Sequence, residues 1–312
     1  MIPGNRQRSF CLLLHDPLRH RRLLRGARIL LSYFSVCLGL LPVLSGSCRK
    51  EPPQDPPAAP EAPPVAEADS VLTRIRIRTD GPEAERLDLF IYGTGGTRTL
   101  EKHITLDSFP EELGILTLPG EKLLAGIANS PHRFNLKALE RYDAMEQLAF
   151  SFADDDPSRP ILGGSAMTEG QTGELTLKPL LCRIVLVSVS NTMDGYDLLE
   201  NPRVRLLDLP DTAEILRQQD FRPAELIDAT PWTALPCDVG YFPQEPRLSL
   251  WCYPNDTPET VLGAPRPSLE FLCEIRGETC SFEVPLPPLP RGCTKEIDLT
   301  IDGPGNHRYK IR

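Results

Sequence analysis

Hydrophobic and polar residues alternate along much of the chain after residue 70, with the two-residue period of β-strands. In segment 71–79, Ile75 and Ile77 fall on one face and three arginines fall on the other. Successive side chains of a strand point to opposite faces of a sheet, so this pattern predicts a half-buried strand. Comparable patterns predict further strands at 86–92, 97–106, 113–118, 122–128, 173–178, 181–189, 203–207, 248–252, 269–275, 279–284 and 295–301.

Two segments depart from the strand pattern. Residues 135–148 combine helical spacing with helix-forming residues, and residues 212–219 predict a second, short helix. Many short strands separated by proline and glycine turns are typical of a β-sandwich rather than of a parallel sheet. The fold class we predict is mostly β, with two tandem β-sandwich domains and one or two short helices. We place the N-terminal sandwich at 70–179 and the C-terminal sandwich at 180–312.

Six cysteines lie in the strand-rich region, and two of them fall on one predicted hairpin. Segment 269–284 is predicted to turn at Arg276 and Gly277, which places Cys273 directly across from Cys280. Cross-strand neighbours are within reach of a disulfide, so this pair is a candidate bridge. Two small, buried thiols are the alternative interpretation. No Cys-x-x-Cys or His-x-x-x-His spacing occurs, and we expect no metal site.

The first 47 residues have the layout of an export signal. Five arginines precede sixteen mostly apolar residues at 29–44, and the small residues 45–47 follow. A spanning helix needs roughly 20 apolar residues, so the pattern favours a signal peptide over a membrane anchor. Cys48 comes next, in a context that resembles a relaxed lipobox. We therefore expect cleavage before Cys48 and lipidation of this residue. An ordinary signal peptide with an incidental cysteine is the alternative.

Residues 48–69 are predicted to form a tether between the lipid and the folded part. Seven prolines lie between Pro52 and Pro64, and the segment contains no aromatic residue. It cannot bury enough apolar surface to offset its ordering entropy, and its proline content favours an extended spacer. A proline-rich recognition motif is the other interpretation, but it fits poorly behind an export signal.

Charge limits the classes of partner. Without residues 1–47 the chain has 27 Lys and Arg against 42 Asp and Glu, a net charge near −15. Nucleic-acid binding requires a basic surface first, so we expect no nucleic-acid partner.

The sequence contains no recognisable catalytic motif. The histidines after residue 48 are His103, His132 and His307. Glycine-containing segments 93–97 and 163–165 lack the features of a phosphate loop and of a nucleophile elbow. The acidic segment 153–157 lacks the ligand spacing of a calcium loop. We predict that the chain is not an enzyme and needs no cofactor.

Several phrases resemble, in their order, the Bacteroidales fimbrillin superfamily, and within it the anchor subunits of type V pili. These are LLAGIAN at 123–129, PILGGSA at 160–166, LLCRIVL at 180–186, LWCYPN at 250–255 and RGCTKEIDLTI at 291–301. In the last phrase, Cys293 and Lys295 depart from the family pattern. The resemblance covers most of residues 70–302 and implies two transthyretin-like β-sandwiches.

The resemblance implies a role in assembly. Type V pilins are exported as lipoproteins and polymerise when a strand of one subunit fills a groove in its neighbour, which is β-augmentation. The implied partners are pilin subunits, bound by β-strand addition, and the outer membrane, through the lipid on Cys48. The protein would be exposed at the cell surface, in the fimbrium. The candidate exchangeable first strand is 71–79, with Val71, Thr73, Ile75, Ile77 and Thr79 as its alternating positions.

An anchor role is favoured over a stalk role. Stalk subunits lose their first strand to an arginine-specific protease. The three arginines of 71–79 make such cleavage chemically possible in this chain. The tail after Ile301 is short for a donor strand, which indicates an anchor that keeps its first strand and its lipid.

A glycan-binding or adhesive surface lipoprotein without a pilus role is the alternative function. Trp232, Trp251 and Tyr253 are candidates for a sugar-stacking platform, with packing in the core as the other interpretation. Exposed aromatic residues would favour this alternative, whereas an exchangeable first strand would favour the pilus subunit.

Overall fold

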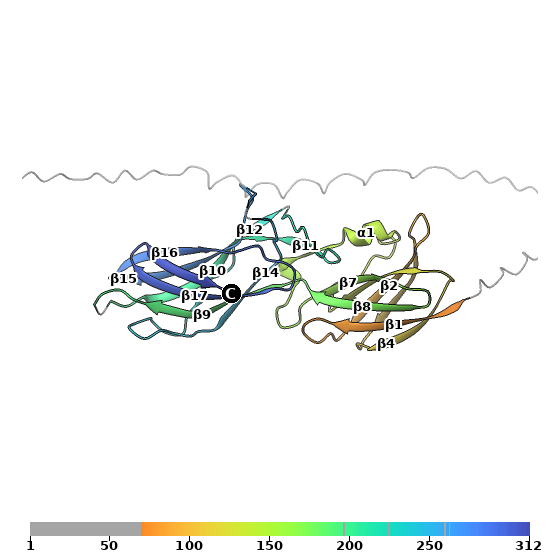
Figure 1. Ribbon diagram of the computed structural model, residues 1–312, viewed down its shortest axis with the longest axis horizontal. Helices are drawn as coiled ribbons and strands as arrows, with labels where there is room; N and C mark the ends of the chain where they lie inside the picture. Colours follow the sequence, from red (N-terminus) through yellow and green to blue (C-terminus); the bar gives the residue numbers. More distant parts are fainter. Residues whose placement is uncertain (1–69, 196, 224, 259, 262) are drawn as a thin grey trace, which may run out of the picture. The chain divides into compact units, whose positions relative to one another are not determined.

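The computed structural model describes residues 70–312, except residues 196, 224, 259 and 262 (Figure 1). Most of the described residues lie in strands, and their helical part is one short α-helix and one 3-10 turn. The predicted fold class, mostly β with sandwich architecture and short helices, is confirmed. The predicted signal peptide 1–47, the lipidated Cys48 and the tether 48–69 lie outside the described residues.

Seven strands that precede Leu180 form one sheet, in the order β3-β2-β5-β7-β8-β1-β4. Their bounds are β1 Val71–Thr79, β2 Leu87–Gly93, β3 Leu100–Leu106, β4 Glu112–Thr117, β5 Lys122–Ala128, β7 Leu162–Met167 and β8 Thr172–Pro179. Neighbouring strands are antiparallel except β1 and β8, which run parallel. The sheet is therefore mixed, and its parallel pair involves the first strand.

This sheet curls around one apolar core. Ile75 of β1, Leu89 of β2 and Leu175 of β8 are buried in the same cluster, together with Ile115 of β4. Strands from both ends of the sheet contribute to the cluster, so the two ends must face each other across it. The alternation of apolar and polar residues in segment 71–79 allows β1 to contribute to this core, because every second residue of the strand points inward.

The opposite face of β2 supports a second cluster. Phe90 and Tyr92 point to this side and pack with Tyr142 and Met145 of helix α1 (Tyr142–Glu146). The Tyr92 hydroxyl donates a hydrogen bond to the carbonyl of Leu139 at 3.0 Å. Strand β2 is thus covered on both faces, which explains why nearly all of its residues are buried.

The strands after residue 180 form two further sheets. One has the order β12-β10-β15-β16 with β13 paired to β10, and the other has the order β14-β9-β17-β18. The bounds are β9 Cys182–Asn191, β10 Glu200–Pro210, β12 Leu226–Ala229, β13 Thr233–Ala234, β14 Leu248–Cys252, β15 Ser268–Ile275, β16 Glu278–Pro285, β17 Thr294–Gly303 and β18 Asn306–Ile311. β9 and β17 run parallel (Figure 1).

Both of these sheets contribute to one core. Leu186 of β9 and Leu299 of β17 come from one sheet, and Leu206 of β10 and Phe271 of β15 come from the other. Two sheets that share a core in this way form a β-sandwich.

A short strand pair joins residues from both sides of Leu180. β6 (Ala149–Ser151) pairs with β11 (Thr212–Glu214), and the 3-10 turn Phe152–Asp154 follows β6. Ile215 and Tyr253 then pack into the cluster of Phe90 and Tyr92. The division of the folded part at residue 180 stays a prediction, since this cluster draws on both sides of it.

Both helix predictions need correction. The segment predicted as a helix at 135–148 is helical only in α1, because Leu100 N–H bonds to Glu140 O and Tyr142 N–H bonds to Arg98 O, each at 2.8–3.0 Å. These bonds tie the segment to the start of β3 and replace helical hydrogen bonds. The segment 212–219 begins instead as strand β11, which is held by its pairing with β6. Tertiary strand pairing outweighs helix propensity at both places.

Candidate functional site

Strand β1 is the structural element on which the predicted function depends. It lies between β4 and β8, as the orange strand in Figure 1 shows. Val71–Arg76 pair with residues of β4 in antiparallel register, and Arg74–Thr79 pair with β8 in parallel register. The central residues Arg74, Ile75 and Arg76 therefore have strand partners on both sides. β1 fills a slot between two strands that do not touch each other in the sheet order.

The inward side of β1 is buried. Thr73, Ile75 and Ile77 are at most 1% exposed, and the Thr73 hydroxyl lies 2.8 Å from the hydroxyl of Thr117 on β4. Full burial of an isoleucine side chain contributes roughly 1.5–3 kcal/mol. Removal of β1 would expose Leu175, Leu177 and other residues of the core and would leave the Thr117 hydroxyl without its partner.

Of the five alternating positions predicted to face the core, the structure buries the three central ones. Val71 and Thr79, at the two ends of β1, are only partly buried. Arg74, Arg76 and Arg78 are exposed, as predicted, and Arg76 pairs with Glu174 at 3.3 Å on the surface. An exposed pair of this kind contributes little to stability, so the apolar side chains hold the strand in place.

A cleft of about 590 Å³ runs along the exposed side of β1. It is lined by Arg74, Arg76, Glu112, Met167, Glu169, Thr172, Gly173 and Glu174. Basic residues of β1 and acidic residues of its neighbours thus share this surface. Met167 is 58% exposed, so an apolar side chain lies at the wall of an otherwise polar cleft.

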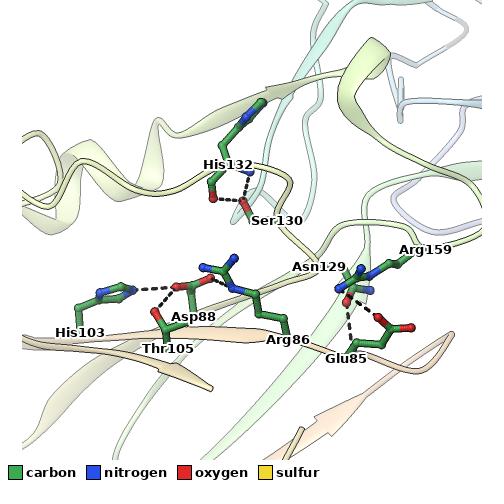
Figure 2. A network of polar contacts seen from close by, with 9 residues as sticks. All are labelled: Glu85, Arg86, Asp88, His103, Thr105, Asn129, Ser130, His132 and Arg159. Carbon is green, nitrogen blue, oxygen red and sulfur yellow. Dashed lines mark hydrogen bonds and ion pairs between the residues drawn. The ribbon is translucent and has the colours of Figure 1, made fainter. Parts of the chain in front are cut away.

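A polar cluster occupies one end of β2 and is shown in Figure 2. Asp88 is 1% exposed, and its Oδ1 lies 3.0 Å from Nε2 of His103 and accepts a hydrogen bond from the Thr105 hydroxyl at 2.7 Å. Nε of Arg86 lies 3.4 Å from the other carboxylate oxygen. The His103 ring stacks on Phe90 at 4.4 Å between centroids. The sequence did not indicate this cluster, because its members become neighbours only through the register of β2 and β3.

The cluster lacks the arrangement of a catalytic triad. Thr105 donates to Asp88, and no hydrogen bond joins a hydroxyl or thiol to His103 among the described residues. A nucleophile would have to contact the imidazole. We interpret the cluster as the structural means by which Asp88 is buried. The prediction that the protein is not an enzyme stays a prediction.

A second part of Figure 2 shows how the chain turns after β5. Asn129, at a positive φ of 58°, accepts a hydrogen bond from the N–H of Glu85 and donates one to the carbonyl of Pro160, both at 3.1 Å. The Glu85 side chain pairs with Arg159 at 3.2 Å on the surface. Asn129 therefore holds three loops together, which is a structural task for the asparagine at the end of the LLAGIAN phrase.

The carboxylates of the acidic segment 153–157 form hydrogen bonds and an ion pair that stabilise the local fold. Asp155 Oδ1 accepts a hydrogen bond from the N–H of Ile161 at 2.9 Å, and Asp156 Oδ1 accepts bonds from the N–H and hydroxyl of Ser158. Asp154 pairs with His132 at 3.1 Å. Among the described residues, no group of three His, Cys, Asp or Glu side chains is arranged to hold a metal ion.

The three aromatic candidates for a sugar platform do not form an exposed surface, and Trp251 packs against the buried cluster that contains Tyr253. Trp232 is partly buried under the guanidinium groups of Arg203 and Arg205, and Tyr253 is completely buried. Trp251 lies under Arg183 on β14. Packing, the alternative interpretation, accounts for Tyr253.

An aromatic pair that sequence reasoning missed is strongly exposed. Tyr241 is 87% exposed and Phe242 is 74% exposed, with their ring centroids 5.5 Å apart. The two residues are adjacent in the chain, and the glycine before them and the proline after them were the available signal of a surface turn.

The predicted hairpin at Arg276 and Gly277 is confirmed. Both residues have positive φ, 53° and 79°, which is the requirement of a two-residue type I′ turn. Cys273 lies directly opposite Cys280, and both sulfurs are free thiols in the structure. The register needed for the bridge is present, and the disulfide itself stays a prediction.

The described residues therefore form a protein of the strand-rich, sandwich class whose first strand fills a slot between two others. Their one α-helix is too short to cross a bilayer, and residues 70–312, with the gaps given above, contain no candidate span.

Several solved structures have a fold similar to that of this chain. No family model and no curated protein matches the chain. A proposed cell adhesion protein of Parabacteroides distasonis superposes with a TM-score of 0.63 at 11% identity, covering 78% of this chain and 96% of that one. A proposed cell adhesion protein of Bacteroides eggerthii gives 0.53 at 10% identity, covering 78% and 95%. A second protein of this description from Parabacteroides distasonis gives 0.53 at 12% identity, covering 77% and 98%.

The chain shares the fold of these three proteins over most of its length. This finding agrees with the mostly β, sandwich architecture that the sequence predicted.

Proposed function

We propose that the protein is an outer-membrane lipoprotein that acts as a pilus subunit, the anchor that holds the base of the pilus by β-strand complementation. The observation that carries the proposal is the slot of β1 between β4 and β8. A strand held on both sides by backbone bonds, and from within by Thr73, Ile75 and Ile77, occupies a place that another strand of the same pattern would fit. Such exchange is the physical basis of β-augmentation.

Two further observations support the proposal. The fold is that of proteins described as proposed cell adhesion proteins. The sequence before β1 carries a signal-like segment, Cys48 and a proline-rich spacer, in the order that a lipid-anchored surface protein needs. The lipid on Cys48 would keep the chain at the membrane, and the pilin partner would bind through the sandwich.

The first experiment separates sheared pili from outer membranes of the native host after chemical cross-linking. We expect mass spectrometry to find an acylated Cys48 peptide in the membrane fraction, in a chain cross-linked to a pilin. A chain in the sheared filaments that begins after Arg74, Arg76 or Arg78 would contradict the anchor role and indicate a stalk or tip subunit. An acylated chain without attached pilin would contradict the pilus role.

A lock on β1 tests strand exchange directly. Thr73 of β1 and Ile115 of β4 are antiparallel register partners, so cysteines at these two positions can be oxidised to bind β1 to β4. We expect the oxidised double variant to lose its cross-link to pilin and the reduced form to regain it. The single variant Thr73→Cys is the matched control. Equal cross-linking of the locked and reduced forms would show that β1 does not exchange.

A second function is favoured by one observation, the exposed pair Tyr241 and Phe242. Paired exposed aromatics are a common means of binding sugars or partner surfaces. In this function the protein is an adhesive or glycan-binding surface lipoprotein. Replacement of both residues by alanine should then abolish glycan-array binding, whereas Tyr309→Ala, at a residue 43% exposed, should not. Absence of glycan binding by the unmodified chain would exclude this function for the glycans on the array.

A further inference from the structure

Three cysteines lie in a row across neighbouring strands of one sheet. Cys182 at the start of β9 is the register partner of Cys252 at the end of β14. On the other side of β9, the N–H of Arg183 bonds to the carbonyl of Cys293 at 2.8 Å, and Thr294 is the register partner of Arg183. Cys293 therefore stands next to Cys182 at the entry to β17. The sequence separates these residues by up to 111 positions, so only the sheet topology brings them together.

The spacing of the row suits a disulfide. Neighbouring strands lie about 4.8 Å apart, and disulfide-bonded residues have Cα separations of about 4.4–6.8 Å. The strand register places Cys293 beside Cys182, whose thiol donates a hydrogen bond to the carbonyl of Pro290 at 3.2 Å, in the same loop as Cys293. The three thiols are not a metal site, because no group of metal-ligating side chains is found in the described part of the chain.

Exposure distinguishes the members of the row. Cys252 and Cys182 are completely buried, whereas Cys293 is partly exposed in the loop between Gly292 and Thr294. Cys293 is thus the sulfur that an external reagent reaches first. Its thiolate is favoured as well, since the neighbouring Cys182 thiol and the nearby Lys295 lower the pKa of Cys293.

Cys182 is the proton-bearing partner. The neighbouring Cys293, followed by burial, raises the pKa of Cys182 well above the ordinary value. Burial also raises the pKa of Cys252, which keeps that thiol protonated and inert. An accessible thiolate next to a buried thiol is the arrangement of an attacking and a resolving cysteine.

We propose that Cys182 and Cys293 are a redox-active pair that forms a disulfide between β9 and the entry to β17. The oxidant is a small-molecule disulfide, which is reduced to two thiols. The Cys293 thiolate attacks one sulfur of the oxidant, whose S–S bond breaks and releases one thiolate that takes up a proton. Cys182 then loses its proton and attacks the Cys293 sulfur, which breaks the mixed disulfide and releases the second oxidant thiol. Two protein thiols are oxidised to one disulfide, and the oxidant disulfide is reduced to two thiols.

The Cys182–Cys293 disulfide would stabilise the loop at Arg291–Cys293, which already connects segments that are distant in the sequence. Arg291, two residues before Cys293, donates hydrogen bonds to the carbonyls of Gly163 and Lys178 on one side and of Ile215 on the other. A disulfide at Cys293 would fix this loop against β9. It would also close a loop that contains most of the residues after Leu180, and cross-links that close long loops restrict the unfolded chain most.

The test uses the full chain purified in detergent and incubated with oxidised glutathione at pH 8. Peptide mapping by mass spectrometry without reduction, after digestion with trypsin and Glu-C, assigns each linkage, because Glu270 separates Cys252 from Cys273. We expect a linked peptide pair that contains Cys182 and Cys293, the loss of two reactive thiols, and a urea midpoint above that of the reduced chain. Both cysteines recovered as free thiols, or Cys182 joined to Cys252, would overturn the proposal.

Variants give independent controls on the same mapping. Cys293→Ser should leave Cys182 reduced and return the urea midpoint to that of the reduced chain. Cys237→Ser, at an exposed cysteine outside the row, should leave the linkage intact. Glutathione that persists on Cys293 in the unmodified chain would show that Cys182 does not resolve the mixed disulfide and would also overturn the proposal. A bridge between Cys273 and Cys280 appears as a different peptide pair.

Discussion

Arg291 binds five backbone carbonyls from three separate segments, and no carboxylate of the described residues pairs with it. Its Nη1 donates to Ile215 O at 2.6 Å and Arg217 O at 2.9 Å, and its Nη2 donates to Gly163 O at 2.9 Å and Lys178 O at 2.7 Å. Its Nε donates to the carbonyl of Pro179 at 3.2 Å. Burial lowers the pKa of Arg291 to about 10, so the group is still charged at neutral pH. Only the planar fork of an arginine reaches all of these carbonyls.

We expect Arg291→Lys to lower the free energy of unfolding by about 2–4 kcal/mol. Lysine keeps the charge but cannot reproduce the fork, so several of these carbonyls would lose their donor. Urea unfolding of the full chain measures the change. Arg247→Lys, at a side chain 74% exposed, is the matched control and should change the midpoint little. Equal midpoints for the two variants would contradict the structural role of Arg291.

Asp155 sets a pH dependence through its burial. Desolvation raises the pKa of Asp155 from 3.8 to about 6 in the folded protein, against the lowering effect of its bond from Ile161. The protonated carboxyl therefore stabilises the fold fully below about pH 4, and this contribution is lost as the pH rises through about 6. The difference between the two pKa values corresponds to roughly 3 kcal/mol.

We expect Asp155→Asn to be more stable than the unmodified chain at pH 7, with a gain of roughly 2–3 kcal/mol that disappears near pH 4. The asparagine oxygen can still accept the Ile161 N–H, and no charge has to be buried. Urea unfolding at both pH values measures the gain. Asp154→Asn removes a charge from the same loop at a side chain 43% exposed and is the control. A gain that is equal at pH 4 and pH 7 would exclude the titration of Asp155 as its cause.

At the scale of the element, the two edges of β1 differ along its length. β4 pairs with it as far as Arg76, whereas β8 pairs with it from Arg74 to Thr79. Arg78 therefore has a strand partner on one side only, apart from the single bond of Ile77 N–H to Glu111 O. A protease needs an extended, accessible backbone, and Arg78 meets this condition better than Arg74.

We expect limited digestion by an arginine-specific protease to cut first after Arg78 and only later after Arg74. Ile77→Ala should accelerate both cuts, because it removes roughly 2–4 kcal/mol of packing that holds the strand. Mass spectrometry of a digestion time course gives the order. Leu116→Ala, at a residue of β4 that is 59% exposed, should leave the rate unchanged. Simultaneous cutting after all three arginines would show that β1 is released as a whole before cleavage.

At the scale of the whole molecule, the proposed anchor requires that Cys48 be lipidated. We expect Cys48→Ser to move the protein from the outer-membrane fraction to the periplasmic or culture fluid, because a single change removes the acyl chains. Cys237→Ser, at an exposed cysteine of the folded part, should leave the fractionation unchanged. Retention of Cys48→Ser in the membrane would contradict the lipid anchor and leave the fold unaffected.

The strands were largely predictable, and the helices were not. The segment predicted at 71–79 matches β1 in both bounds and burial, because alternation is a local property of a strand with one buried face. The segment at 212–219 begins as strand β11, a pairing that local helix propensity could not indicate, since the partner Phe150 lies more than 60 residues away. The candidate site was predictable to the same extent: the sequence indicated β1 and its faces, but not the strands on either side of it.

Local interactions account for the alternating faces of β1, the type I′ turn at Arg276 and Gly277, and the register that places Cys273 opposite Cys280, and all three could be predicted from the residues. The parallel pairs β1–β8 and β9–β17, the carbonyls around Arg291 and the row of Cys182, Cys252 and Cys293 became visible only in the folded chain. These features join residues that are distant in the chain. Their geometry depends on which strands become neighbours, and a local pattern does not encode that choice.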